Sequence, residues 1–180
     1  MGKDSCNSNA SAWVRRFAAL VPAGGPVLDL ACGGGRHTRL FLDLGYPVTA
    51  LDKDIDQSPG MAGAEVIRAD LEDGGPWPLG QRRFAGIVVT NYLWRPLLPM
   101  LTAALAADGV LIYETFAVGN EALGRPRNPD YLLRRGELLQ AFADLTIVAY
   151  EDGATGTAVM QRLCAVNGPG PLSLNHAPVQ

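Results

Sequence analysis

The sequence contains few of the residues that build disulfide frameworks, metal sites or nucleic-acid surfaces. It has three cysteines and two histidines in 180 residues. Cys6, Cys32 and Cys164 are far apart and form no CxxC pair, so neither a zinc site nor a disulfide framework is supported, and we expect no metal. Lysine and arginine number 15 against 18 acidic residues, for a net charge of −3. A broad nucleic-acid footprint would need clustered positive charge, so nucleic acid is not favoured as a partner.

A long apolar run is also absent. No stretch approaches the ~20 residues that a membrane-spanning helix needs, so we expect no membrane partner. Residues 1–9 carry no apolar signal core, and Cys6 stands where a myristoylation signal has Ser or Thr. With cysteines that suit a reducing compartment, these features predict a cytoplasmic protein.

What the sequence does contain is short apolar runs alternating with amphipathic segments. Its length suits one domain, which we place at 10–167, with a flexible segment at 1–9 and a loose tail at 168–180. Apolar runs predict strands over 27–31, 47–52, 65–71, 84–93, 109–117, 146–152 and 157–167. Apolar residues at helical spacing predict helices over 11–21, 37–45, 95–109 and 135–145.

The order of these segments predicts the fold class. Strands that alternate with helices form a parallel sheet with helices on both faces. The last two strands are joined by the short turn GATG at 153–156, so one of them must be antiparallel. We therefore expect an α/β fold, a Rossmann-like three-layer sandwich. Its mostly parallel seven-stranded sheet should have one antiparallel strand in a C-terminal hairpin.

Three consecutive glycines follow the first predicted strand, in the stretch VLDLACGGGRHTRLF at 27–41. Bare backbone at 33–35 lets a ligand approach closely, and the helix that follows presents unpaired N–H groups. Carboxylates occur at the ends of three consecutive predicted strands, as Asp29, Asp52 and Asp70. Because ligands bind at the carboxyl ends of the strands in open α/β sheets, these three side chains are predicted to face one crevice.

A dinucleotide and an adenosyl cofactor compete for this glycine loop. The dinucleotide fingerprint requires G-x-G-x-x-G, but Gly33 and Gly35 are followed by Thr38 where the third glycine or alanine belongs. Asp29 would also sit badly beside a pyrophosphate. A nicotinamide-dependent oxidoreductase is therefore the less favoured interpretation.

A cofactor that carries a positive charge fits the acidic residues better. Asp29 would bind an ammonium group, directly or through water, and Asp52 would accept both hydroxyls of a ribose. Asp70, with the backbone of Leu71, would read the amino edge of an adenine. An adenosine with an amino-acid tail combines these groups, and S-adenosyl-L-methionine is such a molecule.

Four segments resemble, in order, the motifs of class I S-adenosylmethionine-dependent methyltransferases. VLDLACGGGR resembles their first motif, ALDKD (50–54) their acidic loop, and RADL (68–71) their adenine-side motif. FAGIVVTNYL (84–93) resembles the strand that carries the motif after the fourth strand. The resemblance extends over about residues 11–167.

Within that superfamily the chain looks closest to small bacterial enzymes of the tellurite-resistance type. The resemblance rests on GYPVTALDKD (45–54) and RRGELLQAF (134–142). It implies transfer of a methyl group from S-adenosyl-L-methionine to a small polar or anionic acceptor. The cofactor-binding residues that it implies are Asp29, Ala31, Gly33, Gly35, Arg36, Asp52, Lys53, Asp70, Leu71, Asn91 and Tyr92.

The sequence does not single out a catalytic residue, because methyl transfer needs mainly alignment and exclusion of water. The candidates near the acceptor are Tyr92, Glu114, Arg125, Arg127 and Tyr131. The loop around Arg125 and Arg127 carries four arginines up to residue 135, which predicts either an anion-binding lid or a solvated surface. Glu114 is interpreted as a general base or as one half of an ion pair. His37 is expected at the surface or behind the site rather than in catalysis.

Two further functions remain open beside the small-molecule enzyme. One is a methyltransferase that acts on protein or RNA, although the segment Asn91–Trp94 lacks the prolines of enzymes that methylate base amino groups. The other is a non-catalytic module that binds the adenosyl ligand. The sequence leaves the oligomeric state open.

Overall fold

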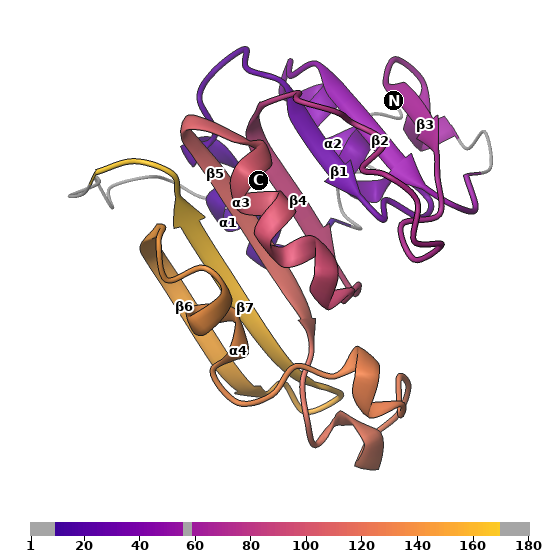
Figure 1. The fold of residues 1–180 in the computed structure, drawn as a ribbon, viewed down its shortest axis with the longest axis vertical. Helices are drawn as coiled ribbons and strands as arrows, with labels where there is room; N and C mark the ends of the chain where they lie inside the picture. The colour runs from indigo at the N-terminus through magenta and orange to yellow at the C-terminus, as the bar shows by residue number, and fades with distance from the viewer. Residues whose placement is uncertain (1–9, 56–58, 170–180) are drawn as a thin grey trace, which may run out of the picture.

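The computed structural model describes residues 10–55 and 59–169, so the predictions for 1–9 and for the tail from 170 lie outside the described residues. Its strands form one seven-stranded sheet in the order β3-β2-β1-β4-β5-β7-β6 (Figure 1). The strands are β1 (Val27–Leu30), β2 (Val48–Asp52), β3 (Glu65–Arg68), β4 (Phe84–Thr90), β5 (Leu105–Phe116), β6 (Thr146–Ala154) and β7 (Val159–Val166). Strands β1 to β5 pair in parallel, and β7 is antiparallel to both β5 and β6. The predicted fold class is therefore confirmed, with β7 as the antiparallel strand.

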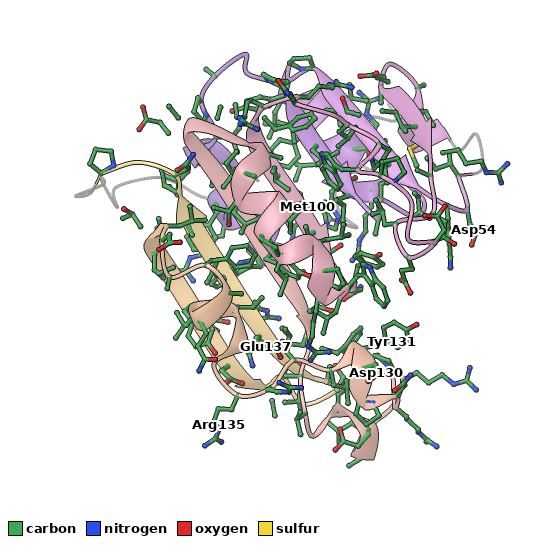
Figure 2. All side chains as sticks on the ribbon, viewed as in Figure 1. Asp54, Met100, Asp130, Tyr131, Arg135 and Glu137 are labelled. Carbon is green, nitrogen blue, oxygen red and sulfur yellow. The ribbon has the colours of Figure 1, made fainter. Side chains whose placement is uncertain are left out.

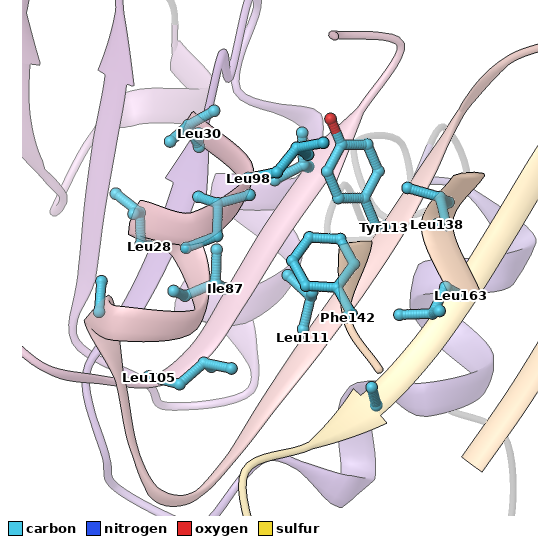
Figure 3. Packing of buried hydrophobic residues seen from close by; sticks show 14 of the residues in the cluster. Leu28, Leu30, Ile87, Leu98, Leu105, Leu111, Tyr113, Leu138, Phe142 and Leu163 are labelled. Atoms are coloured by element: carbon cyan, nitrogen blue, oxygen red, sulfur yellow. The ribbon is translucent and has the colours of Figure 1, made fainter. Parts of the chain in front are cut away.

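Helices cover both faces of the sheet and complete the three layers. The α-helices are α1 (Ala12–Phe17), α2 (Arg36–Asp43), α3 (Leu98–Ala104) and α4 (Glu137–Ala141). Single 3₁₀ turns are η2 (Ala18–Leu20), η3 (Pro59–Met61), η4 (Arg95–Leu97), η5 (Asn120–Ala122) and η6 (Pro129–Tyr131). Helices α1 and α2 pack in one hydrophobic cluster with one face of the sheet, and α3 and α4 pack in a second cluster with the other. Figure 3 shows this second cluster, where Leu28, Ile87 and Leu111 of the strands lie close to Leu98 of α3.

The predicted helix over 95–109 is wrong in its last part. Helix α3 ends at Ala104, and β5 already begins at Leu105. Leu105 pairs with Phe84, and the register then shifts before Gly86 pairs with Val110. The buried side chain of Leu105 fits the apolar spacing of a helix and of a strand equally well, so periodicity alone does not separate them.

Strands β3 and β4 and helix α4 are among the elements that are shorter than predicted. Strand β3 ends at Arg68, which leaves Asp70 in the turn that follows, and β4 ends at Thr90 because Asn91 has a φ of 55°. Helix α4 begins only after Gly136, whose φ is 69°. A positive φ is incompatible with both regular structures, so β4 ends before Asn91 and α4 begins after Gly136.

The strand order reverses at β1, which has β2 on one side and β4 on the other. Leu30, the last residue of β1, pairs with Leu51 of β2 and with Val89 of β4. The carboxyl ends of the three strands are therefore level. A switch point of this kind opens a crevice between the loops that leave the strands.

Candidate active site

The glycine loop after β1 is held in place by the carboxylate at the end of β2. The backbone N–H of Gly33 donates to Oδ2 of Asp52 at 2.9 Å, and the N–H of Asp54 donates to Oδ1 at 3.0 Å. Ala31, Gly33 and Gly35 have φ values of 54°, 51° and 77°. Only glycine adopts such values at little cost, which explains two of the three glycines.

The three glycines have different spatial roles. A Cβ atom on Gly35 would lie 3.0 Å from Sδ of Met61, and one on Gly60 would lie 2.9 Å from the carbonyl oxygen of Gly34. The loop thus packs tightly against η3. Cβ atoms on Gly33 and Gly34 would meet nothing within 4 Å. These two residues border open space, where a ligand can approach the backbone.

Asp29, at the third position of β1, is buried beneath this loop rather than exposed in it. The residue is 1% exposed, and its Oδ2 accepts a hydrogen bond from the Thr38 hydroxyl at 2.6 Å. Burial raises the pKa of Asp29 from 3.8 to about 6, and the hydrogen bond from Thr38 opposes that rise. Asp29 therefore ties β1 to α2, and its contact with a ligand ammonium group stays a prediction. Thr38, which breaks the dinucleotide fingerprint, is the partner of this carboxylate.

A pocket lies at the ends of β1, β2 and β3 and is bordered on its other side by Tyr92. We call it the strand-end pocket. Its lining residues are Ala31, Asp52, Lys53, Ala69, Asp70, Leu71, Glu72 and Tyr92. Six of them were predicted to bind the cofactor, and the structure brings those six together. Sequence analysis missed Glu72, because no motif marks it. Burial first, and then the Glu72 carboxylate, raise the pKa of Tyr92.

A second, larger cavity of about 370 Å³ lies on the α1 side of the same strand ends; we call it the α1 cavity. It is lined by Ser11, Ala12, Trp13, Arg16, Arg36, Asn91, Glu114, Glu151, Met160 and Arg162. The predicted site residues Arg36, Asn91 and Glu114 are therefore here and not in the strand-end pocket. Asn91 lines the α1 cavity while the next residue, Tyr92, lines the strand-end pocket, so the two spaces adjoin at the end of β4.

No protein-family model and no curated protein matches this sequence. Solved structures match its fold. TehB from Haemophilus influenzae superposes with a TM-score of 0.66 at 19% identity, over 89% of this chain and 63% of TehB, so this chain spans less than two thirds of that protein. A TehB-like SAM-dependent methyltransferase from Corynebacterium glutamicum gives 0.61 at 19% identity, over 87% of this chain and 88% of the other. The glycopeptide N-methyltransferase MtfA, complexed with S-adenosylhomocysteine, gives 0.59 at 21% identity, over 86% and 88%.

This chain has the class I methyltransferase fold. The motif resemblance found in the sequence is thus confirmed at the level of the fold. The methyltransferase fold places the glycine loop, Asp52 and Asp70 at one edge of the sheet, around the strand-end pocket.

The first two arginines of the arginine-rich loop between β5 and α4, Arg125 and Arg127, line neither the strand-end pocket nor the α1 cavity. Arg125 and Arg127 are exposed, and Arg134 and Arg135 line a separate cavity of about 460 Å³ beside the β6–β7 hairpin. Only Tyr131 of this loop approaches the strand-end pocket, where its hydroxyl donates to Oε2 of Glu72 at 3.4 Å. An anion-binding role for Arg125 and Arg127 stays a prediction.

A charged clasp holds the last part of this loop against η4. Arg95 forms a two-bond ion pair with Glu137, through Nε to Oε1 at 2.7 Å and Nη2 to Oε2 at 3.0 Å. The same guanidinium donates to the carbonyl oxygens of Asp130 and Leu132 at 2.7 and 2.8 Å. Figure 2 shows Asp130, Tyr131 and Glu137 gathered in this region. The position of Tyr131 therefore depends on Arg95.

His37, in the first turn of α2, is buried and structural. Its Nε2 accepts a hydrogen bond from the backbone N–H of Ser11 at 3.1 Å, and Nδ1 lies 3.4 Å from the Thr90 hydroxyl. Burial lowers the pKa of His37 to about 3, and the charge of Arg36 lowers it further. The neutral ring joins α1, α2 and β4 behind the α1 cavity, so of the two expected places, the surface and a position behind the site, the structure shows the second.

The described residues contain no cluster of three or more His, Cys, Asp or Glu side chains that could hold a metal ion. Within residues 10–55 and 59–169, no helix is long and apolar enough to cross a membrane.

Proposed function

We propose that this protein is an S-adenosyl-L-methionine-dependent methyltransferase that acts on a small polar acceptor. The observation that carries the proposal is that Asp52 and Asp70 line one pocket beside a glycine loop with open space over Gly33 and Gly34. The site lies at the switch point of the sheet, where ligands of such folds bind. The solved structures of MtfA with S-adenosylmethionine, S-adenosylhomocysteine and sinefungin support the choice of cofactor.

The residues of the strand-end pocket fit the adenosine part of this cofactor. Asp52 offers two carboxylate oxygens to the ribose hydroxyls. Asp70 and the Leu71 backbone offer an edge to the adenine, and Ala31 and Tyr92 offer apolar walls. The amino-acid tail would extend from this pocket towards the α1 cavity.

Two residues at the junction of the two spaces suit the tail. Arg36 extends from the first turn of α2 into the α1 cavity and is available for a carboxylate. Asn91 lies at the end of β4, with its backbone N–H bonded to the carbonyl oxygen of Glu114 at 2.9 Å. When bound, the cofactor supplies a methyl group on a positively charged sulfur. The chain binds and orients the two reactants and excludes water between them.

Binding and turnover test this proposal separately. We expect S-adenosylhomocysteine to bind the full chain with a micromolar dissociation constant in a calorimetric titration, and NADH to produce no heat. Binding of NADH alone would overturn the proposal in favour of a nicotinamide-dependent enzyme. Binding of S-adenosylhomocysteine with no transfer of labelled methyl to any fraction of a metabolite extract would indicate a non-catalytic binding module.

A further inference from the structure

The α1 cavity contains a row of charged side chains that crosses three strands. Glu114 of β5 pairs in register with Arg162 of β7, which pairs with Glu151 of β6. Nε of Arg162 donates to Oε2 of Glu114 at 3.1 Å, and Nη1 donates to Oε2 of Glu151 at 2.9 Å. The two carboxylates therefore share one guanidinium.

Glu114 is the member of this row that lies nearest the end of β4, because it pairs in register with Thr90. Its side chain is 6% exposed, and that exposed part lines the α1 cavity. Arg162 occupies Oε2, and within the described residues no group donates a hydrogen bond to Oε1. Glu114 is also joined through its backbone to Asn91, where the two spaces adjoin. One oxygen of a fixed carboxylate is thus available beside the end of the cofactor pocket.

The charges around this oxygen favour a particular class of acceptor. The α1 cavity shares Glu151, Met160 and Arg162 with a smaller cavity of about 150 Å³ along the β6–β7 hairpin, where Asp152 adds a third carboxylate. The guanidiniums that line the α1 cavity are Arg16, Arg36 and Arg162. Arg162 bonds Oε2 of both Glu114 and Glu151, and Nη1 of Arg16 lies 3.9 Å from Oε1 of Glu151. Within the described residues the guanidiniums thus engage both oxygens of Glu151 but only Oε2 of Glu114, so Oε1 of Glu114 is the carboxylate oxygen of this row that lacks a donor.

We propose that the methyl acceptor is a small amine and that Oε1 of Glu114 accepts a hydrogen bond from its nitrogen. This inference rests on the proposed methyltransferase function. An amine supplies the N–H donor that Oε1 of Glu114 lacks, whereas an oxyanion at this oxygen would bring two negatively charged acceptors together. Trp13 and Met160 add apolar surface for a carbon chain or a ring.

The transfer step balances without a further reactant. The acceptor loses a proton to water and reacts as the neutral amine. Its lone pair forms the new N–C bond as the S–CH₃ bond breaks, and the electron pair of that bond stays on the sulfur as a neutral thioether. The product nitrogen is positively charged, and its surplus proton passes to Glu114 and then to water. The hydrogen bond to Oε1 directs the lone pair towards the methyl group.

Methyl transfer to defined probes tests the acceptor class. The wild-type chain is incubated with S-adenosyl-L-methionine and benzylamine, histamine, ethanolamine, catechol or selenite, and each product is identified by mass spectrometry. We expect N-methylated product from at least one amine and none from catechol or selenite. Methylation of catechol or selenite but of no amine would overturn the proposal. So would the absence of both methylation and binding for all three amines in the presence of S-adenosylhomocysteine.

The variant Glu114→Gln tests the role of the carboxylate. A lost hydrogen bond to a charged group typically reduces kcat/KM for the amine by roughly ten- to a hundredfold. Affinity for S-adenosylhomocysteine should remain within about twofold, which also shows that the variant is folded. The matched control is Glu65→Gln, which removes an ion pair with Arg82 at 2.7 Å on the β3 side of the sheet and should change neither quantity.

The outcomes separate this inference from the proposed function. Failure of the wild type to bind S-adenosylhomocysteine would contradict the methyltransferase function itself. Intact cofactor binding, with Glu114→Gln as active on the amine as wild type, would contradict only the role of Glu114. If the variant does not fold, the acceptor probes on the wild-type chain still decide the class of acceptor.

Discussion

Substitution of Asp52 by alanine tests the contribution of its carboxylate to the ligand site. In the structure its carboxylate accepts hydrogen bonds from Gly33 and Asp54 at 2.9 and 3.0 Å. A hydrogen bond to a charged group contributes about 1.5–3 kcal/mol. The ribose would add such contacts, while part of the gain is lost because the side chain is half-buried and exchanges with water. We expect Asp52→Ala to weaken S-adenosylhomocysteine binding by at least ~1.4 kcal/mol, which is tenfold in the dissociation constant.

Isothermal titration calorimetry of the two proteins, with a neighbouring variant as control, measures this effect. Asp54 lies two residues further along the chain, and it is not among the residues that line the strand-end pocket. Asp54→Ala carries the same change in charge and should bind within about twofold of wild type. Equal affinities for wild type and Asp52→Ala would refute the assignment of Asp52 to the ribose. Equal losses in both variants would show that only the overall negative charge matters.

Three other substitutions test the loop, the buried carboxylate and the clasp. Gly35→Ala should lower the unfolding free energy by roughly 1–2 kcal/mol because its φ is 77°, whereas Gly34→Ala should leave the Tm unchanged. The pKa of Asp29 is raised from 3.8 to about 6, so the folded state holds this proton more tightly, and the stability it contributes below pH 4 is lost as pH rises through 6. Asp29→Asn should therefore become more stable than wild type between pH 4 and 7, by up to about 3 kcal/mol in chemical denaturation, and a constant difference would argue against this. Arg95→Met removes two hydrogen bonds to carbonyl oxygens of the loop 118–134 and the two-bond ion pair with Glu137 just after it. Limited trypsin digestion should therefore cleave this loop several times faster, and an unchanged rate would exclude the clasp.

The acidic residues at successive strand ends show how far local patterns determine a site. Asp52 and Asp70 were predicted to share a crevice because parallel strands end at one edge of a sheet, and the structure places both in the strand-end pocket. Asp29 follows the same pattern but is buried against Thr38. Alternation along β1 does not distinguish a carboxylate above the loop from one beneath it, because that depends on how α2 packs.

The ion pair between Glu114 and Arg162 could not be predicted from a sequence pattern. The two residues are 48 positions apart, and they meet because β7 returns antiparallel to β5 in one particular register. A shift of β7 by one residue would turn Arg162 to the other face of the sheet, away from Glu114. Nothing local to either residue encodes that register.

The arginine-rich loop shows the same limit, here for residues that were predicted near the site but lie away from it. Arg125 and Arg127 were expected near the acceptor because they follow β5, but they are exposed and line neither space at the strand ends. Two of the contacts that position this loop come from Arg95, which is 35 and 37 positions before Asp130 and Leu132.

The sequence by itself determined the fold class, the glycine loop and the acidic strand ends, because backbone conformation and strand periodicity act over a few neighbouring residues. Only the tertiary structure decided which carboxylate is buried, which faces a pocket and which arginine neutralises Glu114. Those outcomes follow from strand register and helix packing, which bring together side chains that are distant in the chain.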